Sequence, residues 1–353
     1  MENKICEKCG DKFTVTDNDQ KFYEKISPII SGKKYLISTP KYCPDCRQKR
    51  RLMFRNERHL YYRNCDLCGK KTLSWYHPDA KVIMYCHDCY WSDKWDPLEM
   101  GKDIDFNRSF LEQVTDLCKI TPKMHLLVKN NENADYVNLS GYNKNCYLII
   151  AAEYNEDCLY GRQIIKSKDC VDTLECFESE HCYQVVDAHK CYELFYSMNC
   201  SNCSESMFLY DCRSCTNCLF CANLRNKEFY IYNKKHSKED YEKKKKEIFE
   251  KLNSGGLPEL KQEFYKVYLD AIHKDMEGQN NQDCLGNFLN NCKNCTSCYD
   301  LSYAEDCKYV YTGFNVKDTM DVCHTTDGEL GYEVMSFGYG SYDAMFTCGS
   351  WTS

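Results

Sequence analysis

The chain has 353 residues, of which 28 are cysteine and 29 are tyrosine, and its formal net charge is −7. About 8% cysteine in so long a chain excludes a small disulfide-stapled domain, and 43% apolar residues exclude a disordered low-complexity protein. No run of about 18 apolar residues occurs and the start, MENKICEKCG, has no apolar core, so we expect a reduced cytoplasmic protein with neither a transmembrane helix nor a signal peptide.

Charge and cysteine spacing both change near residue 100. Residues 1–100 carry 19 Lys and Arg against 14 Asp and Glu, a net charge of +5, so the remaining residues carry −12. Eight cysteines lie before residue 90, all in C-x-x-C pairs, Cys118 stands alone, and nineteen lie between Cys146 and Cys348. A basic head on an acidic body indicates that any nucleic-acid contact belongs to the head.

The C-x-x-C pairs predict two structural zinc sites. Zinc takes four thiolates in a tetrahedron, and four protein ligands leave no open position for catalysis. The second set of cysteines has a 17-residue spacer between Cys68 and Cys86, which is typical of zinc ribbons. The first set has a 33-residue insert between Cys9 and Cys43. His87 lies inside the last knuckle, and we favour an exposed position for it over a role as ligand. The predicted zinc ligands are Cys6, Cys9, Cys43, Cys46, Cys65, Cys68, Cys86 and Cys89.

The first set also carries a family resemblance. Three motifs occur in this order: Cys6-x2-Cys9-Gly10-x2-Phe13, Phe22-Tyr23-Glu24-Lys25 and Cys43-Pro44-x-Cys46-Arg47-x3-Arg51. Through these motifs, residues 1–51 resemble a bacterial probable zinc-ribbon domain family. More widely, the segments 91–97 and 224–230 and the Cys/Tyr repeats resemble cysteine-rich zinc-ribbon proteins of uncultured bacteria. The resemblance implies zinc binding and a fold, and it implies no activity.

The residues after Cys46 predict a basic helix. Positions 47–63 hold seven Lys and Arg against one Glu, and four of the arginines share one helical face. Two interpretations stay open: salt-sensitive, sequence-independent binding of nucleic acid, or pairing with the acidic body, where positions 128–232 hold 9 Lys and Arg against 15 Asp and Glu. The candidate residues for binding nucleic acid or a partner are Arg47, Lys49, Arg50, Arg51, Arg55, Arg58 and Arg63.

The later cysteines follow a register of three. Cys146, Cys158, Cys170 and Cys182 lie twelve residues apart, and most of the following cysteines continue at multiples of three. Short apolar or Tyr-rich strands, broken by Asn, Asp, Ser and Lys, predict the coils of a parallel β-solenoid with cysteine side chains stacked inside. The alternatives are thiolate clusters that bind metal, for which 212–221 and 292–298 are the densest candidates, and disulfides.

A helical hairpin interrupts this pattern. Ser237-x2-Asp240 is a capping box that opens a charged helix over about 238–252, Gly255 and Gly256 end it, and Pro258 begins a second helix to about Met276. The predicted domains are zinc ribbon 1 with the basic helix (1–60), zinc ribbon 2 (61–100), a helical linker (101–127), a first solenoid segment (128–235), the helical hairpin (236–278) and a second solenoid segment (279–353).

The predicted fold class is therefore mainly β with small α parts: two N-terminal zinc ribbons, then a cysteine-laddered parallel β-solenoid interrupted by a helical hairpin. No G-x-S-x-G, P-loop or HExxH motif occurs, and Asp157 and Asp169 suit turns better than catalysis.

We predict a non-catalytic zinc-binding scaffold with Zn²⁺ at two structural sites, which docks nucleic acid or a protein partner through its basic head. It is expected to bind no membrane, the sequence identifies no small-molecule substrate, and its solenoid end could self-associate. A metal- or thiol-buffering protein is the alternative, and a β-helical hydrolase is the second alternative.

Overall fold

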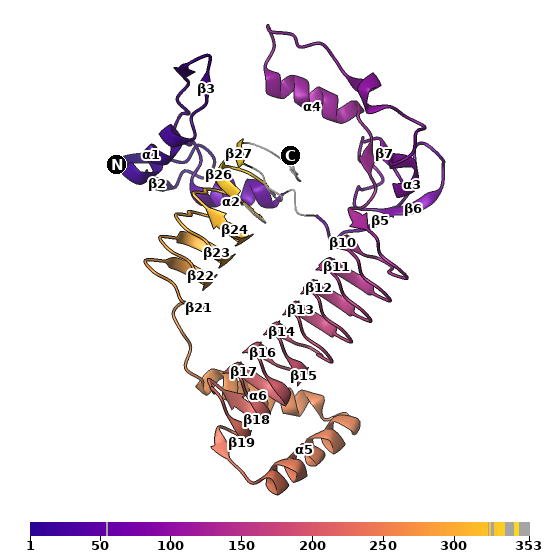
Figure 1. Cartoon of the computed structure of the whole chain (residues 1–353), viewed down its shortest axis with the longest axis vertical. Helices are drawn as coiled ribbons and strands as arrows, with labels where there is room; N and C mark the ends of the chain where they lie inside the picture. Colours follow the sequence, from indigo (N-terminus) through magenta and orange to yellow (C-terminus); the bar gives the residue numbers. More distant parts are fainter. Residues whose placement is uncertain (54–55, 324, 326–327, 336–341, 346–353) are drawn as a thin grey trace. The chain divides into compact units, whose positions relative to one another are not determined.

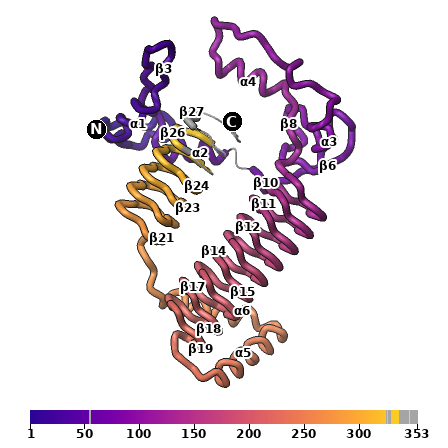
Figure 2. The backbone as a smooth tube through the Cα atoms, in the orientation of Figure 1, coloured from indigo at the N-terminus to yellow at the C-terminus, as the bar shows by residue number. Residues whose placement is uncertain are grey.

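The computed structural model describes residues 1–53, 56–323, 325, 328–335 and 342–345. The chain divides into two compact units, Met1–Asn56 with His273–Ser353 and Glu57–Ile272. The first zinc-knuckle segment thus belongs to the same unit as the C-terminal strands, and Figures 1 and 2 show α1 and α2 beside β26.

Residues 2–52 form two hairpins and two helices. β1 (Glu2–Ile5) pairs antiparallel with β2 (Lys12–Val15), β3 (Ile29–Ile30) pairs with β4 (Lys33–Lys34), and the helices are α1 (Asp17–Lys25) and α2 (Pro44–Leu52). A capping box starts α1, because the side chains of Thr16 and Asp19 each accept a hydrogen bond from the other residue's backbone N–H. Pro44 lies in the first turn of α2, where no intrahelical N–H bond is needed, so α2 begins at the second knuckle.

The second zinc-knuckle segment opens the other unit. β5 (Tyr61–Asn64) pairs antiparallel with β6 (Lys71–Ser74), and β7 (Met84–Tyr85) pairs in parallel with β8 (Lys123–Met124). The helices of this segment are α3 (His87–Tyr90), the 3-10 helix η1 (Pro97–Met100) and α4 (Phe110–Ile120). The helix expected within residues 101–127 is therefore present, and none of its residues is buried.

A long parallel sheet follows, which we call the first ladder. Its strands are β9 (Val128–Lys129), β10 (Asn138–Gly141), β11 (Tyr147–Glu153), β12 (Leu159–Ile165), β13 (Val171–Phe177), β14 (Val186–His189), β15 (Tyr192–Phe195), β16 (Met198–Ser201), β17 (Ser204–Arg213), β18 (Thr216–Ala222) and β19 (Glu228–Ile231), with β20 (Lys234–Lys235) antiparallel at the end. Equivalent positions lie twelve residues apart, as in the register Tyr147↔Leu159↔Val171. We call each twelve-residue segment a rung.

Within a rung, the backbone turns at every third residue. Asn145, Leu148 and Ala151 all have φ near 53°, in the left-handed region that L-residues rarely adopt. The residue after each of these is buried: Cys146, Ile149 and Ala152 are at most 2% exposed. Burial of one side chain per triplet offsets the backbone strain, and it explains why the cysteines keep a register of three.

Two helices cover part of the first ladder near its β17–β19 end (Figure 1). α5 (Lys238–Asn253) begins at Ser237, whose hydroxyl accepts from the Asp240 N–H, and α6 (Leu257–Asp270) follows it. Their apolar residues Tyr241 and Leu260 pack into one cluster with Phe208 and Phe220 of the sheet. α6 ends six residues before the expected Met276, because the Asn223 side chain bonds both the N–H and the carbonyl of Ile272 and holds that backbone outside the helix.

The C-terminal strands repeat the same geometry and form the second ladder. They are β21 (Gly278–Gln279), β22 (Leu285–Asn290), β23 (Thr296–Ser302), β24 (Tyr311–Phe314), β25 (Val316–Lys317), β26 (Gly328–Tyr332) and β27 (Tyr342–Met345). The register Leu289↔Leu301↔Gly313 again spans twelve residues, with an irregularity at Gly286. Cys292, Cys295, Cys298 and Cys307 lie in its buried core.

The prediction of a mainly β protein with two N-terminal four-cysteine sites is confirmed. The large sheet is parallel-rich and open, since its strand order runs from β20 to β9 without closing on itself. The solenoid stays a prediction that this register favours. None of the described helices is long and apolar enough to span a membrane.

Candidate metal centres

The first four-cysteine site draws on two knuckles of the N-terminal segment. The Sγ atoms of Cys6, Cys9, Cys43 and Cys46 all lie within 4.8 Å of one another, and Cys9 Sγ and Cys43 Sγ are 3.7 Å apart. With metal–sulfur bonds of about 2.3 Å, a tetrahedral zinc ion places its sulfurs about 3.8 Å apart. The four thiols are therefore close enough together to hold one zinc ion.

The backbone around this first site favours thiolates. Gly10, at φ +80°, frees the turn after the first knuckle, and the Cys43 N–H lies 3.3 Å from Cys6 Sγ. Burial raises the pKa of the Cys6 thiol, but the backbone N–H groups around it, that of Cys43 foremost, outweigh burial and lower this pKa to about 6. A bound cation then holds the remaining thiols as thiolates.

The second four-cysteine site repeats this arrangement in the other unit. The Sγ atoms of Cys65, Cys68, Cys86 and Cys89 lie within 4.8 Å of one another, with 3.9 Å between Cys68 and Cys86. Burial opposes ionisation of Cys65, yet backbone N–H groups of its own and the partner knuckle lower the pKa of its thiol to about 7. Burial, followed by the neighbouring thiol of Cys68, raises the pKa of Cys89 to about 12. His87 is exposed and lies outside the cysteine group, as expected.

Two of the arginines that were candidates for phosphate binding are buried within the chain. Arg47 and Arg51 are only 2% and 3% exposed, and both face the carboxylate of Asp321 on the second ladder. Arg47 Nε donates to Asp321 Oδ2 at 2.7 Å, and Arg51 Nη2 lies 3.5 Å from Asp321 Oδ1. We call Arg47, Arg51 and Asp321 the arginine clasp. Burial opposes the charge of Arg47, but the Asp321 carboxylate overrides it and raises the pKa of the guanidinium.

Most of the other candidates are also held within the chain. Arg50 pairs with Glu333, and Arg63 donates to backbone carbonyls of the loop 77–82. Lys49 and Arg58 are exposed, and Arg55 lies outside the described residues. Arg47, Arg50 and Arg51 therefore pair with carboxylates of the same chain. Those carboxylates, Asp321 and Glu333, belong to the second ladder and not to positions 128–232, where the sequence pattern placed the acidic partner, because the N-terminal segment packs in one unit with the C-terminal strands.

Apolar contacts reinforce the arginine clasp. Val15, Tyr23 and Ile26 of the N-terminal segment form one buried cluster with Met320 and Tyr332 of the second ladder. The Tyr23 and Tyr332 rings meet edge-on with centroids 5.0 Å apart. A second ion pair joins Lys308 Nζ to both carboxylate oxygens of the buried Asp19, at 2.6 and 2.9 Å. The N-terminal four-cysteine segment is thus packed directly on the second ladder.

The first ladder contains a third group of thiols. The Sγ atoms of Cys170, Cys176 and Cys182 lie within 4.8 Å of one another, and all three residues are at most 1% exposed. The sequence pattern favoured instead 212–221 and 292–298, which form no such group among the described residues. One signal could have found it: these are the only three cysteines in the sequence spaced six apart in succession, and six residues is half a rung.

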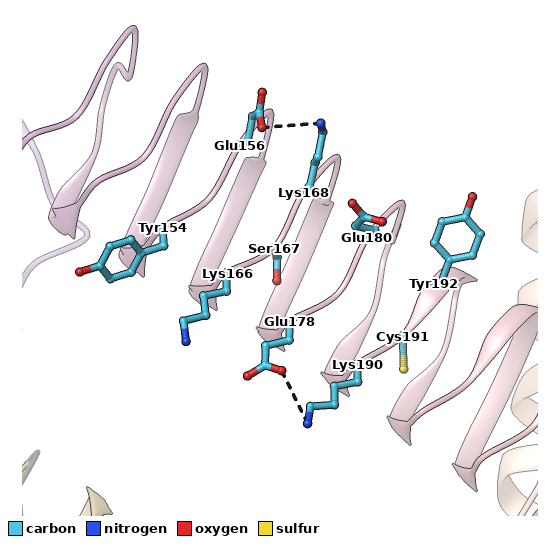
Figure 3. Close-up of a pocket in the computed structure, with 10 residues that line it drawn as sticks. All are labelled: Tyr154, Glu156, Lys166, Ser167, Lys168, Glu178, Glu180, Lys190, Cys191 and Tyr192. Carbon is cyan, nitrogen blue, oxygen red and sulfur yellow. Dashed lines mark ion pairs between the residues drawn. The ribbon is translucent and has the colours of Figure 1, made fainter.

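The outer surface of the first ladder is charged but internally paired. A shallow hollow there is lined by Tyr154, Lys166, Tyr192 and rows of acidic and basic residues, and Figure 3 shows two ion pairs that join successive rungs. These pairs, Glu156 with Lys168 and Glu178 with Lys190, each have an N–O distance of 3.6 Å. Each carboxylate of these two pairs has a lysine opposite it, so the pairs present no convergent carboxylates to a substrate.

Comparison with known proteins agrees with the N-terminal site. Residues 2–54 match the family described as a probable treble clef domain. The resemblance inferred for residues 1–51 is thereby confirmed, and the cysteine geometry of this segment fits a zinc-binding segment. No curated protein matches the sequence.

Among solved structures, a protein from Desulfovibrio desulfuricans G20 described as a candidate acetyltransferase aligns at 9% identity with a TM-score of 0.16. The alignment covers 62% of this chain and 63% of that one, so this chain spans less than two thirds of its length.

Proposed function

We propose that this protein is a non-catalytic scaffold that zinc stabilises at both four-cysteine sites. The observation that carries the proposal is the position of α2. This helix begins at a cysteine knuckle, between Cys43 and Cys46, and one turn later its arginines are buried against Asp321 of the second ladder. Metal at the first site would fix the start of α2, and α2 would fix the end of the ladder. Zinc therefore acts as part of the architecture.

A protein is the partner class that we propose for the head. The arginines that would reach phosphates are mostly used within the chain, and the rest of the chain has a net charge of −12, so nucleic acid would meet few free cations. The head exposes apolar side chains instead: Ile29, Ile30 and Leu36, around the hairpin β3–β4, are 68%, 58% and 70% exposed. Exposed apolar groups close together are typical of protein-binding surfaces.

The experiment compares one ligand from each four-cysteine site. Cys43→Ser removes a ligand of the first site, and Cys86→Ser is its matched control in the other unit. Each variant should lose about one of two zinc ions per chain by elemental analysis. Only Cys43→Ser should expose the second ladder, measured as faster amide hydrogen exchange over residues 289–323. Equal exchange in the two variants, or unchanged exchange in Cys43→Ser, would refute the architectural role of the first site.

A gel-shift titration with RNA and DNA tests the partner class. The full chain should show no retardation at physiological salt, and the charge reversals Lys49→Glu and Arg58→Glu should change nothing. Salt-sensitive binding that these reversals abolish would instead assign the head to nucleic acid.

A further inference from the structure

The three buried thiols of the first ladder form a compact group that no four-cysteine zinc site explains. Cys170 and Cys182 occupy equivalent positions on successive rungs, and Cys176 lies on β13 half a rung from each of them. The three sulfurs therefore come from two positions of the rung and enclose a triangle, instead of forming a single row. All three side chains are at most 1% exposed, so the triangle lies within the buried core.

The size of the triangle suits one metal ion. With metal–sulfur bonds of about 2.3 Å, an ion in the plane of three sulfurs places them about 4.0 Å apart. The observed upper limit is 4.8 Å, so shifts of less than an ångström would close the site. Rotation of a cysteine side chain can supply such a shift without moving the backbone.

The number of ligands decides which metal the site would take. Zinc in structural sites is almost always bound by four ligands, as the two N-terminal sites offer. Three thiolates are a soft ligand set, of the kind that Cu(I), zinc and iron–sulfur clusters take. Zinc and iron–sulfur clusters usually need four protein ligands, whereas three thiolates are enough for Cu(I). Val185 and Ala188 belong to the same buried cluster, so apolar side chains also lie in the core that holds the three thiols.

A second observation concerns a buried hydroxyl on β13. Thr173 lies on β13 between Cys170 and Cys176, is 4% exposed, and its hydroxyl has no hydrogen-bond partner among the described residues. A buried hydroxyl without a partner is costly, and threonine at this position needs an acceptor nearby. Cys170 and Cys176 each lie three residues from Thr173 in the sequence, and a metal-bound thiolate accepts a hydrogen bond better than a thiol does.

We propose that Cys170, Cys176 and Cys182 form a three-coordinate Cu(I) site inside the first ladder. Each ligating thiol gives up its proton to solvent as the metal enters. Because the finished site is closed to solvent, the ion enters while the rungs assemble and is then retained. This site is separate from the four-cysteine sites, for which we propose zinc and whose cysteines lie outside the ladder.

The test uses the full chain, unfolded and refolded without oxygen in the presence of two equivalents of zinc and of Cu(I) buffered by a chelator. Cys176→Ser removes the ligand that completes the triangle. Cys191→Ser is the matched control, since Cys191 is 2% exposed and outside the group, and Ser179 one rung earlier shows that serine fits that row. Copper and zinc per chain are measured by elemental analysis, and copper coordination by X-ray absorption.

The wild-type chain and Cys191→Ser should each keep one copper ion with three sulfur neighbours, with their zinc undiminished. Cys176→Ser should keep its zinc and its circular dichroism spectrum and lose the copper. If Cys176→Ser fails to fold, Cys170→Ser carries the same expectation. Copper that only displaces zinc, a third zinc ion in place of copper, or equal copper in all variants would overturn the proposal.

Discussion

Asp321→Asn tests the arginine clasp most directly. The substitution keeps the shape of the side chain and an oxygen that can accept from Arg47 Nε, now at 2.7 Å, but it removes the only negative charge of the clasp. Two guanidinium groups that are 2% and 3% exposed would then lie buried without a counter-charge. Leaving a buried ion-pair partner uncompensated costs about 3–5 kcal/mol.

The matched control is Asp318→Asn on the same ladder. Asp318 also has a left-handed backbone, at φ 49°, and pairs with Lys25 at 3.0 Å, but the Lys25 side chain is 51% exposed. An exposed pair of this kind contributes about 0–1 kcal/mol. The two variants therefore differ in burial of the pair and share the backbone conformation.

Native-state hydrogen exchange is the assay, because a chain with two units need not unfold in a single transition. In Asp321→Asn, the opening equilibrium of amides at residues 316–323 should rise by roughly a hundred-fold or more. In Asp318→Asn it should rise by less than about five-fold. If the two variants differ by less than a factor of two, burial of the clasp does not hold the N-terminal segment on the ladder.

Three further outcomes are expected. Asp19→Ala loses both the Lys308 ion pair and half of the α1 capping box, so the free energy of unfolding of this unit should fall by about 1–3 kcal/mol. Lys308→Met, which removes only the ion pair, should reproduce this loss only in part. Gly286→Ala places a Cβ against the Cys298 carbonyl oxygen at φ +156°, so amide hydrogen exchange should accelerate across β22. Gly255→Ala, with nothing within 4 Å of its Cβ, should cost only about 1 kcal/mol. Cys118 is exposed, so Cys118→Ala should remove one thiol from the fast phase of an Ellman titration of the native protein. The buried ladder thiols should react only on unfolding, and fast reaction of those thiols would contradict their burial.

The sequence alone determined the features that depend on local chemistry and on period. Two four-cysteine sites follow from the knuckle spacing, because two residues between cysteines are enough to aim both thiols at one ion. The register of three and twelve follows from a rung that turns at every third residue and buries the next one, and it repeats wherever the rung does. The start of α5 follows from Ser237, whose hydroxyl accepts from the Asp240 N–H as an N-cap.

The tertiary structure decided the contacts that join distant positions. Arg47 and Asp321 are 274 residues apart, and nothing in the composition of the basic helix says whether its charges face phosphate or carboxylate. Cys176 joins Cys170 and Cys182 only because the rung is twelve residues long and brings positions half a rung apart together. The end of α6 at Asp270 depends on Asn223, far away in the sequence. Local spacing can specify which ligands gather around one ion, but which buried charge meets which partner depends on how the assembled rungs and the N-terminal segment pack.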